Sequence, residues 1–378
     1  MDEERTPDVP ITDPIEATLA AADRSERHHG GRPPSPGRLN GPGRKYAFTR
    51  AIKEFVATGG IDLSATLTYF MVLSLAPALL AVFSIISLVL ANNAETVQQL
   101  VNDVVVEYVP TDYRGLVVDL VDTIISASSG GAIALAIGIA TALWSASIYV
   151  RAFSRCMNTV YGVQEGRGFV RQIATMLLTT LVLLIGVVLI LVSLALNQSL
   201  VNGVLGPIAD PLGLTDTLTF LTETFLPLWA WLRWPFVLAL MICMIAVLYL
   251  VTPNVKKPKS GWLRSGSVLA ILGIGFAAVA LSIYLSQFAG YSSYGAIGTV
   301  MALLVVLWVF NIVLLFGAYV DAEVARARQL LAGIPAEMAI QLPPRDTARV
   351  HKAKKMRDML ESDGRVLRLT YGTADRAG

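Results

Sequence analysis

The chain has 378 residues, of which 54% are hydrophobic and only 15% are charged. Soluble globular proteins carry about 25% charged residues, so this composition excludes an ordinary soluble domain and indicates an integral membrane protein. The formal net charge is only +2, and the two cysteines, Cys156 and Cys243, are too few for a disulfide framework. Neither cysteine has the spacing of a metal site, and we predict no metal ion and no cofactor.

The first segment, residues 1–44, is polar and rich in Pro, Gly, Arg and Asp. Such a segment buries too little apolar surface to offset the entropy of ordering, so we predict a disordered cytoplasmic tail. It has no apolar core of the length that a cleavable signal peptide needs. The first hydrophobic helix is therefore expected to act as an uncleaved insertion signal.

A short amphipathic pattern follows at residues 46–58, where Phe48, Ile52, Phe55 and Val56 share one helical face. The pattern is typical of a helix that lies in the membrane interface. It fits equally well a cytosolic helix that packs on the protein itself.

Six later segments are apolar enough to cross a hydrocarbon core of about 30 Å. The longest uncharged stretch, residues 265–320, contains no Asp, Glu, Lys or Arg and is divided near its middle by Gly and Tyr residues, so it is expected to form two helices joined by a turn. We predict an all-α, polytopic membrane protein with a membrane domain at residues 45–328. The predicted crossings are at about 63–91, 132–152, 173–196, 228–251, 262–288 and 296–320.

Residues 94–126, between the first and second crossings, are amphipathic rather than uniformly apolar. Their apolar residues recur at helical spacing, acidic residues occupy the other faces, and Pro110 divides the segment. We therefore predict two amphipathic helices on the outer side of the membrane domain.

The distribution of basic residues predicts the orientation. The connections after crossings two and four carry most of the loop bases, whereas Arg114 is the single base in the connections after crossings one and three. By the positive-inside rule both termini are cytoplasmic, in a plasma (inner) membrane protein. The last segment, residues 329–378, is predicted to be a polar cytoplasmic tail; its cluster of Arg, His and Lys residues is typical of a solvated helix and could also touch anionic lipids.

No catalytic set is visible in the sequence. The three histidines lie in the tails, and the crossings contain no nucleophile–base pair and no cluster of metal ligands, so we predict that the chain is not an enzyme. Arg151 and Arg155, four residues apart, could form ion pairs with Asp321 and Glu323 or hold lipid phosphates.

Short motifs along residues 55–328 resemble, in their order, those of the YihY / virulence factor BrkB family, formerly named ribonuclease BN. The positions that carry the resemblance have no role that the sequence explains: they are Tyr69, Ser74, Pro77, Trp144, Ser145, Asn158, Tyr161, Gly162, Pro253, Asn254, Gly266, Tyr294, Gly295, Trp308, Gly317, Ala318 and Glu323. Glu165 and Arg167 belong to the same motifs. Tyr319 follows Gly317-Ala318 where the family commonly has an acidic residue, and Arg151 stands where a small or apolar residue is expected.

The resemblance implies a six-helix inner-membrane protein with a role in the envelope. We expect a non-enzymatic protein that moves or organises a lipid or another amphiphilic envelope component. A ribonuclease that processes transfer RNA precursors, as the old family name suggests, and a structural scaffold for envelope machinery are the alternatives. Membrane lipids are the expected partners, envelope proteins or a second copy of the chain are further candidates, and no nucleic acid is expected.

Overall fold

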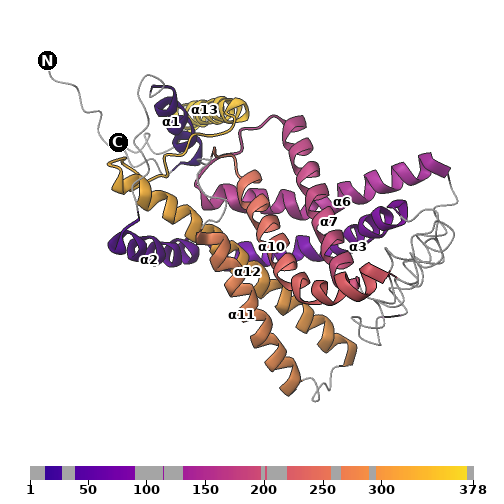
Figure 1. Cartoon of the computed structure of the whole chain (residues 1–378). Helices are drawn as coiled ribbons and strands as arrows, with labels where there is room; N and C mark the ends of the chain where they lie inside the picture. Colours follow the sequence, from indigo (N-terminus) through magenta and orange to yellow (C-terminus); the bar gives the residue numbers. More distant parts are fainter. Residues whose placement is uncertain are drawn as a thin grey trace. The chain divides into compact units, whose positions relative to one another are not determined.

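A computed structural model describes residues 13–27, 39–89, 114, 131–196, 201, 219–256, 265–288 and 295–372. Within these residues the protein is all-helical, as predicted, apart from one isolated bridge between Val255 and Pro344. The helices, labelled in Figure 1, are α1 (Pro14–Arg27), α2 (Gly41–Ala57), α3 (Gly60–Val89), α6 (Gly131–Val160), α7 (Phe169–Ala195), the π-helix η3 (Phe220–Phe225), α10 (Leu226–Val251), α11 (Ser265–Phe288), α12 (Gly295–Leu331) and α13 (Ala348–Tyr371).

A helix covers each of the six predicted crossings within the described residues. Four of these helices are long and apolar enough to span a membrane, over Gly60–Leu79, Phe169–Ala195, Phe220–Val251 and Val300–Leu331. Helix α11 contains a shorter apolar part, Val268–Ala277. The protein is therefore of membrane type, and six crossings remain a prediction.

Several helices run beyond the predicted crossings. Helix α12 continues past residue 320 to Leu331, and α6 continues past residue 152 to Val160. Hydropathy marks where an apolar environment ends, whereas the backbone hydrogen bonds of a helix can continue into water or into a polar cluster. The bounds of a crossing and the bounds of its helix are therefore different quantities.

The prediction of a disordered tail is wrong for the part of residues 1–44 that the structure describes. Helix α1 occupies Pro14–Arg27 and α2 begins at Gly41. The Asp13 side chain accepts a hydrogen bond from the backbone N–H of Ile15 at 3.2 Å at the start of α1. Good helix formers, the Ala-rich stretch of α1, follow this start, and the average composition of the tail conceals them. The rest of the predicted tail, the outer amphipathic helices at 94–126 (apart from Arg114) and Tyr294 lie outside the described residues.

The chain divides into two compact units, which we describe separately. Unit 1 comprises Met1–Ala65, Phe153–Ala174 and Tyr249–Gly378, and unit 2 comprises Thr66–Ala152 and Thr175–Leu248.

In unit 1, α11 and α12 lie side by side (Figure 1) because glycines face each other across the pair. A Cβ atom on Gly317 would lie 2.7 Å from the carbonyl oxygen of Gly266 and 2.7 Å from the hydroxyl of Tyr249. The Tyr249 hydroxyl donates to the carbonyl of Leu314. Small residues of this kind let two helix backbones approach closely, the usual basis of helix association in membranes.

Helix α2 packs on α12 through Ala47, Ala51 and Phe55. The Phe55 ring meets the Phe316 ring edge-on, with centroids 5.7 Å apart. Helix α2 thus packs on the protein, while Ile52 on the predicted apolar face remains 45% exposed, and the choice between an interfacial and a cytosolic helix stays a prediction.

In unit 2, α3, α6 and α7 meet at a small core of Ala81, Ala142 and Leu184. Outside this core, α7 exposes a stripe of aliphatic side chains at helical spacing: Leu178, Val182, Ile185, Leu189 and Val192. An exposed aliphatic stripe along a helix of this length is typical of contact with lipid chains.

Candidate functional site

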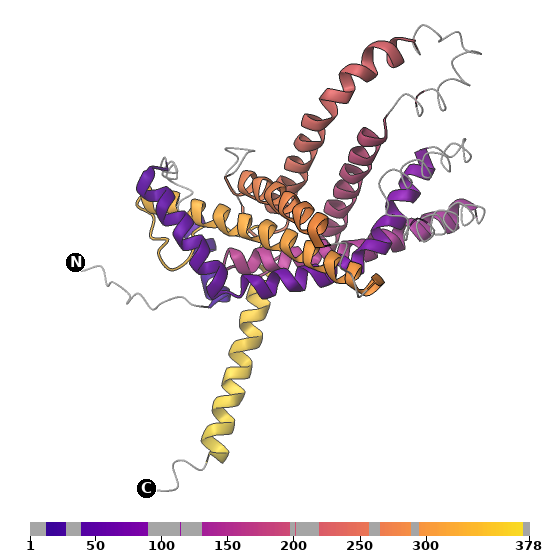
Figure 2. The same cartoon turned by 90° about the horizontal axis from the view of Figure 1, so that it is seen from below.

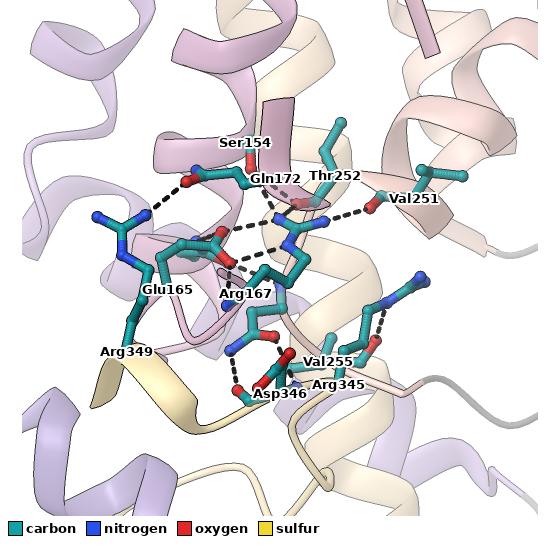
Figure 3. Close-up of polar contacts among 12 residues, drawn as sticks. Ser154, Glu165, Arg167, Gln172, Val251, Thr252, Val255, Arg345, Asp346 and Arg349 are labelled. Atoms are coloured by element: carbon teal, nitrogen blue, oxygen red, sulfur yellow. Dashed lines mark hydrogen bonds and ion pairs between the residues drawn. The ribbon is translucent and has the colours of Figure 1, made fainter. Parts of the chain in front are cut away.

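The most elaborate polar structure among the described residues lies in unit 1, where the end of α6, the loop before α7, the end of α10 and the loop before α13 meet. We call it the junction network and define it by eight residues: Ser154, Asn158, Glu165, Arg167, Thr252, Asn254, Arg345 and Asp346. Figure 3 shows their contacts.

Arg167 is the centre of the junction network and is only 2% exposed. Its guanidinium binds Glu165 through two bonds, Nε to Oε1 at 2.8 Å and Nη2 to Oε2 at 2.7 Å. It also donates to the carbonyls of Val251 (3.2 Å) and Thr252 (2.7 Å) and to the hydroxyl of Ser154 (3.2 Å). A buried arginine is tolerated only when its donors are satisfied in this way, because leaving a buried charge unpaired costs several kcal/mol.

Two asparagine side chains connect the loops around this ion pair. Asn158 donates to Glu165 at 3.1 Å, and its side-chain oxygen accepts from the backbone N–H of Asn254 at 2.8 Å. The Asn254 side chain donates to the carbonyls of Gln164 (2.9 Å) and Asp346 (3.0 Å). It also accepts from the N–H of Asp346 at 3.2 Å. The two side-chain amides thus provide hydrogen-bond partners for backbone groups of the loops.

Arg345 attaches the loop before α13 to the end of α10. It donates from Nε to the carbonyl of Val255 at 3.1 Å and from Nη2 to the carbonyl of Leu250. The backbones also pair, since the N–H of Lys256 donates to the carbonyl of Pro343 at 2.8 Å.

Two glycines permit this convergence. Gly162 has a positive φ of 61° directly after α6, a conformation that favours glycine and turns the chain out of the helix. Gly166 lies so close to the loop before α13 that a Cβ atom would overlap the carbonyl of Asp346. The sequence between α6 and α7 is therefore built for a backbone-to-backbone contact.

The surroundings lower the pKa of both Glu165 and Arg345, for different reasons. Burial raises the pKa of Glu165, but the hydrogen bonds and the charge of Arg167 outweigh burial and hold that pKa below its ordinary value. Glu165 is therefore an ionised partner and not a proton donor near neutral pH. Burial, together with the charges of Arg167 and Arg171, lowers the pKa of Arg345, which shows that positive charges are crowded here.

A second group of buried charges, the α12 ion cluster, comprises Arg50, Glu323 and Arg326. Glu323, 2% exposed, accepts from Arg326 Nε at 2.9 Å and lies 3.3 Å from Nε of Arg50. Among the described residues these are the charged partners of Glu323, and an ion pair between the end of α12 and Arg151 or Arg155 stays a prediction. Nearby, the Tyr161 hydroxyl donates to Asp321 at 3.1 Å.

The predicted lipid contacts lie in different units. Arg151, in unit 2, donates to the carbonyl of Trp144 at 3.1 Å and covers the Trp144 ring at 4.8 Å from its centroid. Arg155, in unit 1, is exposed. The structure therefore gives Arg151 a contact on its own helix and leaves a lipid contact at either residue as a prediction.

The structure brings some of the family-motif positions together and leaves others apart. Asn158 and Asn254 belong to the junction network. Pro253, which lies between Thr252 and Asn254 in the chain, is buried, and Gly162 follows the end of α6. Glu323 belongs to the α12 ion cluster. Tyr161 donates a hydrogen bond to Asp321, which lies two residues before Glu323 on α12.

The remaining positions have local contacts. Gly266, Gly317 and buried Ala318 lie in the α11–α12 contact, Trp308 donates to the carbonyl of Ile61 at 3.4 Å, and Gly295 begins α12. In unit 2, the Ser74 hydroxyl donates to the carbonyl of Met71 at 2.8 Å. The other unit 2 positions are Tyr69, 62% exposed, Pro77 inside α3, exposed Trp144 and half-buried Ser145.

Sequence reasoning missed Arg345, Asp346, Ser154 and Thr252. Arg345 and Asp346 were assigned to a polar tail, and their pairing with residues about 90 positions earlier leaves no local pattern. The one available signal is Arg167, an arginine placed between two glycines in a short loop between apolar helices.

The described residues contain no group of three or more His, Cys, Asp or Glu side chains that could hold a metal ion. The acidic groups of the junction network, Glu165 and Asp346, are instead each matched by an arginine. The arrangement as described is thus suited to hold loops together and to present positive charge.

Comparison with known proteins identifies the chain. The family model described as Virulence factor BrkB matches residues 51–339. The chain is 30% identical over 273 residues to the "Putative ribonuclease-like protein YfkH" of Bacillus subtilis (strain 168), a match that covers 72% of this chain and 92% of that protein. No solved structure matches the chain. With three quarters of its length matched, from within α2 to beyond α12, the protein belongs to the virulence factor BrkB family.

Proposed function

We propose that this protein crosses the plasma (inner) membrane six times, with both termini in the cytoplasm, and moves or organises a lipid or another amphiphilic envelope component without catalysing a reaction. The observation that carries the proposal is the separation of charge from the apolar helices. The buried charged side chains of the described residues, Arg167, Asp321, Glu323 and Arg326, belong to unit 1; Arg167 lies in a loop, and the other three lie in the last three turns of α12.

Several polar groups inside the apolar helices are occupied locally. Thr179 and Thr180 donate to carbonyls of their own helix at 2.7 and 2.8 Å, and Asn311 donates to the carbonyl of Leu307 at 2.8 Å. A secondary ion transporter would be expected to place ionisable side chains near the middle of its crossings. A molecule with a charged head and apolar chains suits these helices better, because its chains need only the apolar surface and its head only the charged ends.

A ribonuclease is the second candidate, because the relative from Bacillus subtilis carries "ribonuclease-like" in its name. RNA cleavage needs a base, an acid or a metal ion at the reacting phosphate. Glu165 is held in a two-bond ion pair and His351 is an exposed residue of α13. We therefore favour the non-enzymatic function.

Purified full-length protein in proteoliposomes separates the two. A fluorescent phospholipid in both leaflets, quenched from outside by a membrane-impermeant reductant, should lose clearly more than half of its signal if the protein moves lipid. Empty vesicles should lose about half, because the inner leaflet is protected. Quenching equal to that of empty vesicles would contradict the transport form of the proposal, and cleavage of a transfer RNA precursor by the same sample would favour the ribonuclease.

A further inference from the structure

The junction network has an exposed edge where the start of α7 meets the start of α13. We call this edge the arginine corner and define it by Phe169, Val170, Arg171 and Arg349. All four residues belong to unit 1 and are exposed, with Phe169 at 70% and Val170 at 78%.

The two arginines of the corner are positioned by the network behind them. Arg171 Nη1 lies 3.1 Å from Asp346 Oδ2, and 67% of the Arg171 side chain is exposed. Arg349 Nη1 donates to the side-chain oxygen of Gln172 at 2.6 Å, as Figure 3 shows. The backbone N–H of Arg349 also donates to the carbonyl of Gly166 at 3.1 Å, which fixes the start of α13 against the loop.

The corner and the network together carry an excess of positive charge. In the interactions described above, the four arginines Arg167, Arg171, Arg345 and Arg349 are combined with the two carboxylates of Glu165 and Asp346. One carboxylate is fully engaged by the buried Arg167, so the surplus lies on the exposed side. Burial and, after it, the charges of Arg167 and Arg171 lower the pKa of Arg345.

Apolar surface adjoins this charge. Phe169 and Val170 form the first turn of α7, which is itself one of the helices able to span a membrane. Consecutive residues on a helix point about 100° apart, so Val170 lies next to Arg171, whereas Phe169 lies on the same face as Gln172, whose side chain binds Arg349. An exposed arginine can contact the anionic head of an amphiphile, and the exposed aromatic and aliphatic side chains beside it can contact its apolar chains. A soluble anion would use only the arginine.

We propose that the arginine corner binds the phosphate of an anionic phospholipid, with Arg171 and Arg349 contacting the phosphate and Phe169 and Val170 contacting the start of the acyl chains. Arginine is suited to this task because its planar guanidinium binds phosphate oxygens in pairs. The inference deepens the proposed function and rests on it for the position of the corner at the cytoplasmic face, where anionic lipids give the membrane a negative surface.

Native mass spectrometry of the detergent-purified full chain tests the proposal. The probes are phosphatidylglycerol and phosphatidylcholine with identical acyl chains, and the variant is R171Q/R349Q. One arginine near an anionic lipid surface contributes about five-fold in affinity, so the double variant should bind phosphatidylglycerol about 30-fold more weakly. The matched control R365Q/R368Q removes two exposed arginines from the far part of α13, which Figure 2 shows extending away from the rest of unit 1, and should bind like the original chain.

The charge-retaining variant R171K/R349K guards against a folding defect. It should keep most of the phosphatidylglycerol preference, and its unfolding temperature and that of R171Q/R349Q should match the original chain. Equal binding of the two lipids, or equal losses in R171Q/R349Q and R365Q/R368Q, would overturn the proposal.

Two competitors distinguish the sources of phosphate. Inorganic phosphate that displaces phosphatidylglycerol at equal concentration would assign the corner to a soluble phosphate and overturn the lipid assignment. A short single-stranded RNA that binds through the same arginines, while phosphatidylglycerol does not, would also overturn it. The two proposals can fail separately. Lipid movement in proteoliposomes without a preference for phosphatidylglycerol would contradict only the lipid site at the arginine corner. A preference for phosphatidylglycerol without lipid movement would contradict only the transport form of the proposed function.

Discussion

Replacement of Arg167 by methionine should destabilise the protein more than any change at an exposed charge. The variant R167M removes the two bonds to Glu165 and leaves that carboxylate, only 14% exposed, without its charged partner. It also removes donors from the carbonyls of Val251 and Thr252. Removal of one partner from a buried ion pair costs about 3–5 kcal/mol.

Thermal unfolding of the detergent-purified full chain, followed by the loss of monomer in size-exclusion chromatography, measures this effect. A change of about 1 kcal/mol shifts the unfolding temperature of a large domain by roughly 2–4 °C, so R167M should lower it by about 10 °C. The control R171Q breaks an exposed ion pair of about 0–1 kcal/mol and should shift it by less than about 3 °C. Equal shifts in R167M and R171Q would refute the central place of Arg167. The double variant E165Q/R167M should recover part of the loss, because no unpaired charge remains.

Three further predictions concern the same unit. The pKa of Glu165 is lower in the folded chain than its ordinary value, so its ion pair stabilises the fold above about pH 4.3, and this stabilisation disappears as the pH falls through the folded pKa. When the unfolding temperature is measured at decreasing pH, it should therefore decline less steeply for E165Q than for the original chain. Identical curves would contradict the pairing. The variant G166A should lose most of its folded yield, because a Cβ atom at this position overlaps a backbone carbonyl. The control G168A, with open space around it, should lower the free energy of unfolding by less than about 1 kcal/mol. Similar yields of the two variants would show that the loop contact does not form. The variant G317A should separate α11 from α12 and lower the unfolding temperature, whereas G275A on α11 meets nothing within 4 Å and should leave it unchanged or raise it slightly.

The helices could be predicted from the sequence because each depends on a local property. An uncharged run such as residues 265–320 indicates apolar helices wherever it occurs, and the turn residues near its middle divide it. The family could be recognised as well, since the motifs that include Asn158, Pro253 and Asn254 resemble those of the family in their order, and the family model matches residues 51–339. The sequence alone indicates no role for these positions, and in the structure the amides of Asn158 and Asn254 join loops.

The junction network could not be predicted because its members come together only through the fold. Arg345 binds carbonyls at the end of α10, about 90 residues earlier in the chain, and nothing near Arg345 indicates this partner. The same holds for Arg50, whose contact with Glu323 joins a residue just before the family match to one near its end. Composition indicated a solvated helix in the C-terminal tail, where α13 lies, but it indicated neither α1 nor the ion pair between Arg357 of α13 and Asp13, directly before α1.

The described structure thus combines apolar helices, in which several polar groups are satisfied locally, with a charged and highly connected junction in unit 1. In such a protein the apolar surface and the charged junction need not be parts of one catalytic pocket. Each is able to serve a different end of the same amphiphilic molecule, and a lipid is the simplest molecule of that kind in a membrane.

The most direct test of this account is an electron cryomicroscopy structure of the full chain in nanodiscs that contain phosphatidylglycerol. We predict ordered lipid density with its phosphate beside Arg171 and Arg349 and its chains along the apolar start of α7. A map of comparable quality that shows ordered protein side chains at the arginine corner, and no ordered lipid there or against the apolar helices, would contradict it.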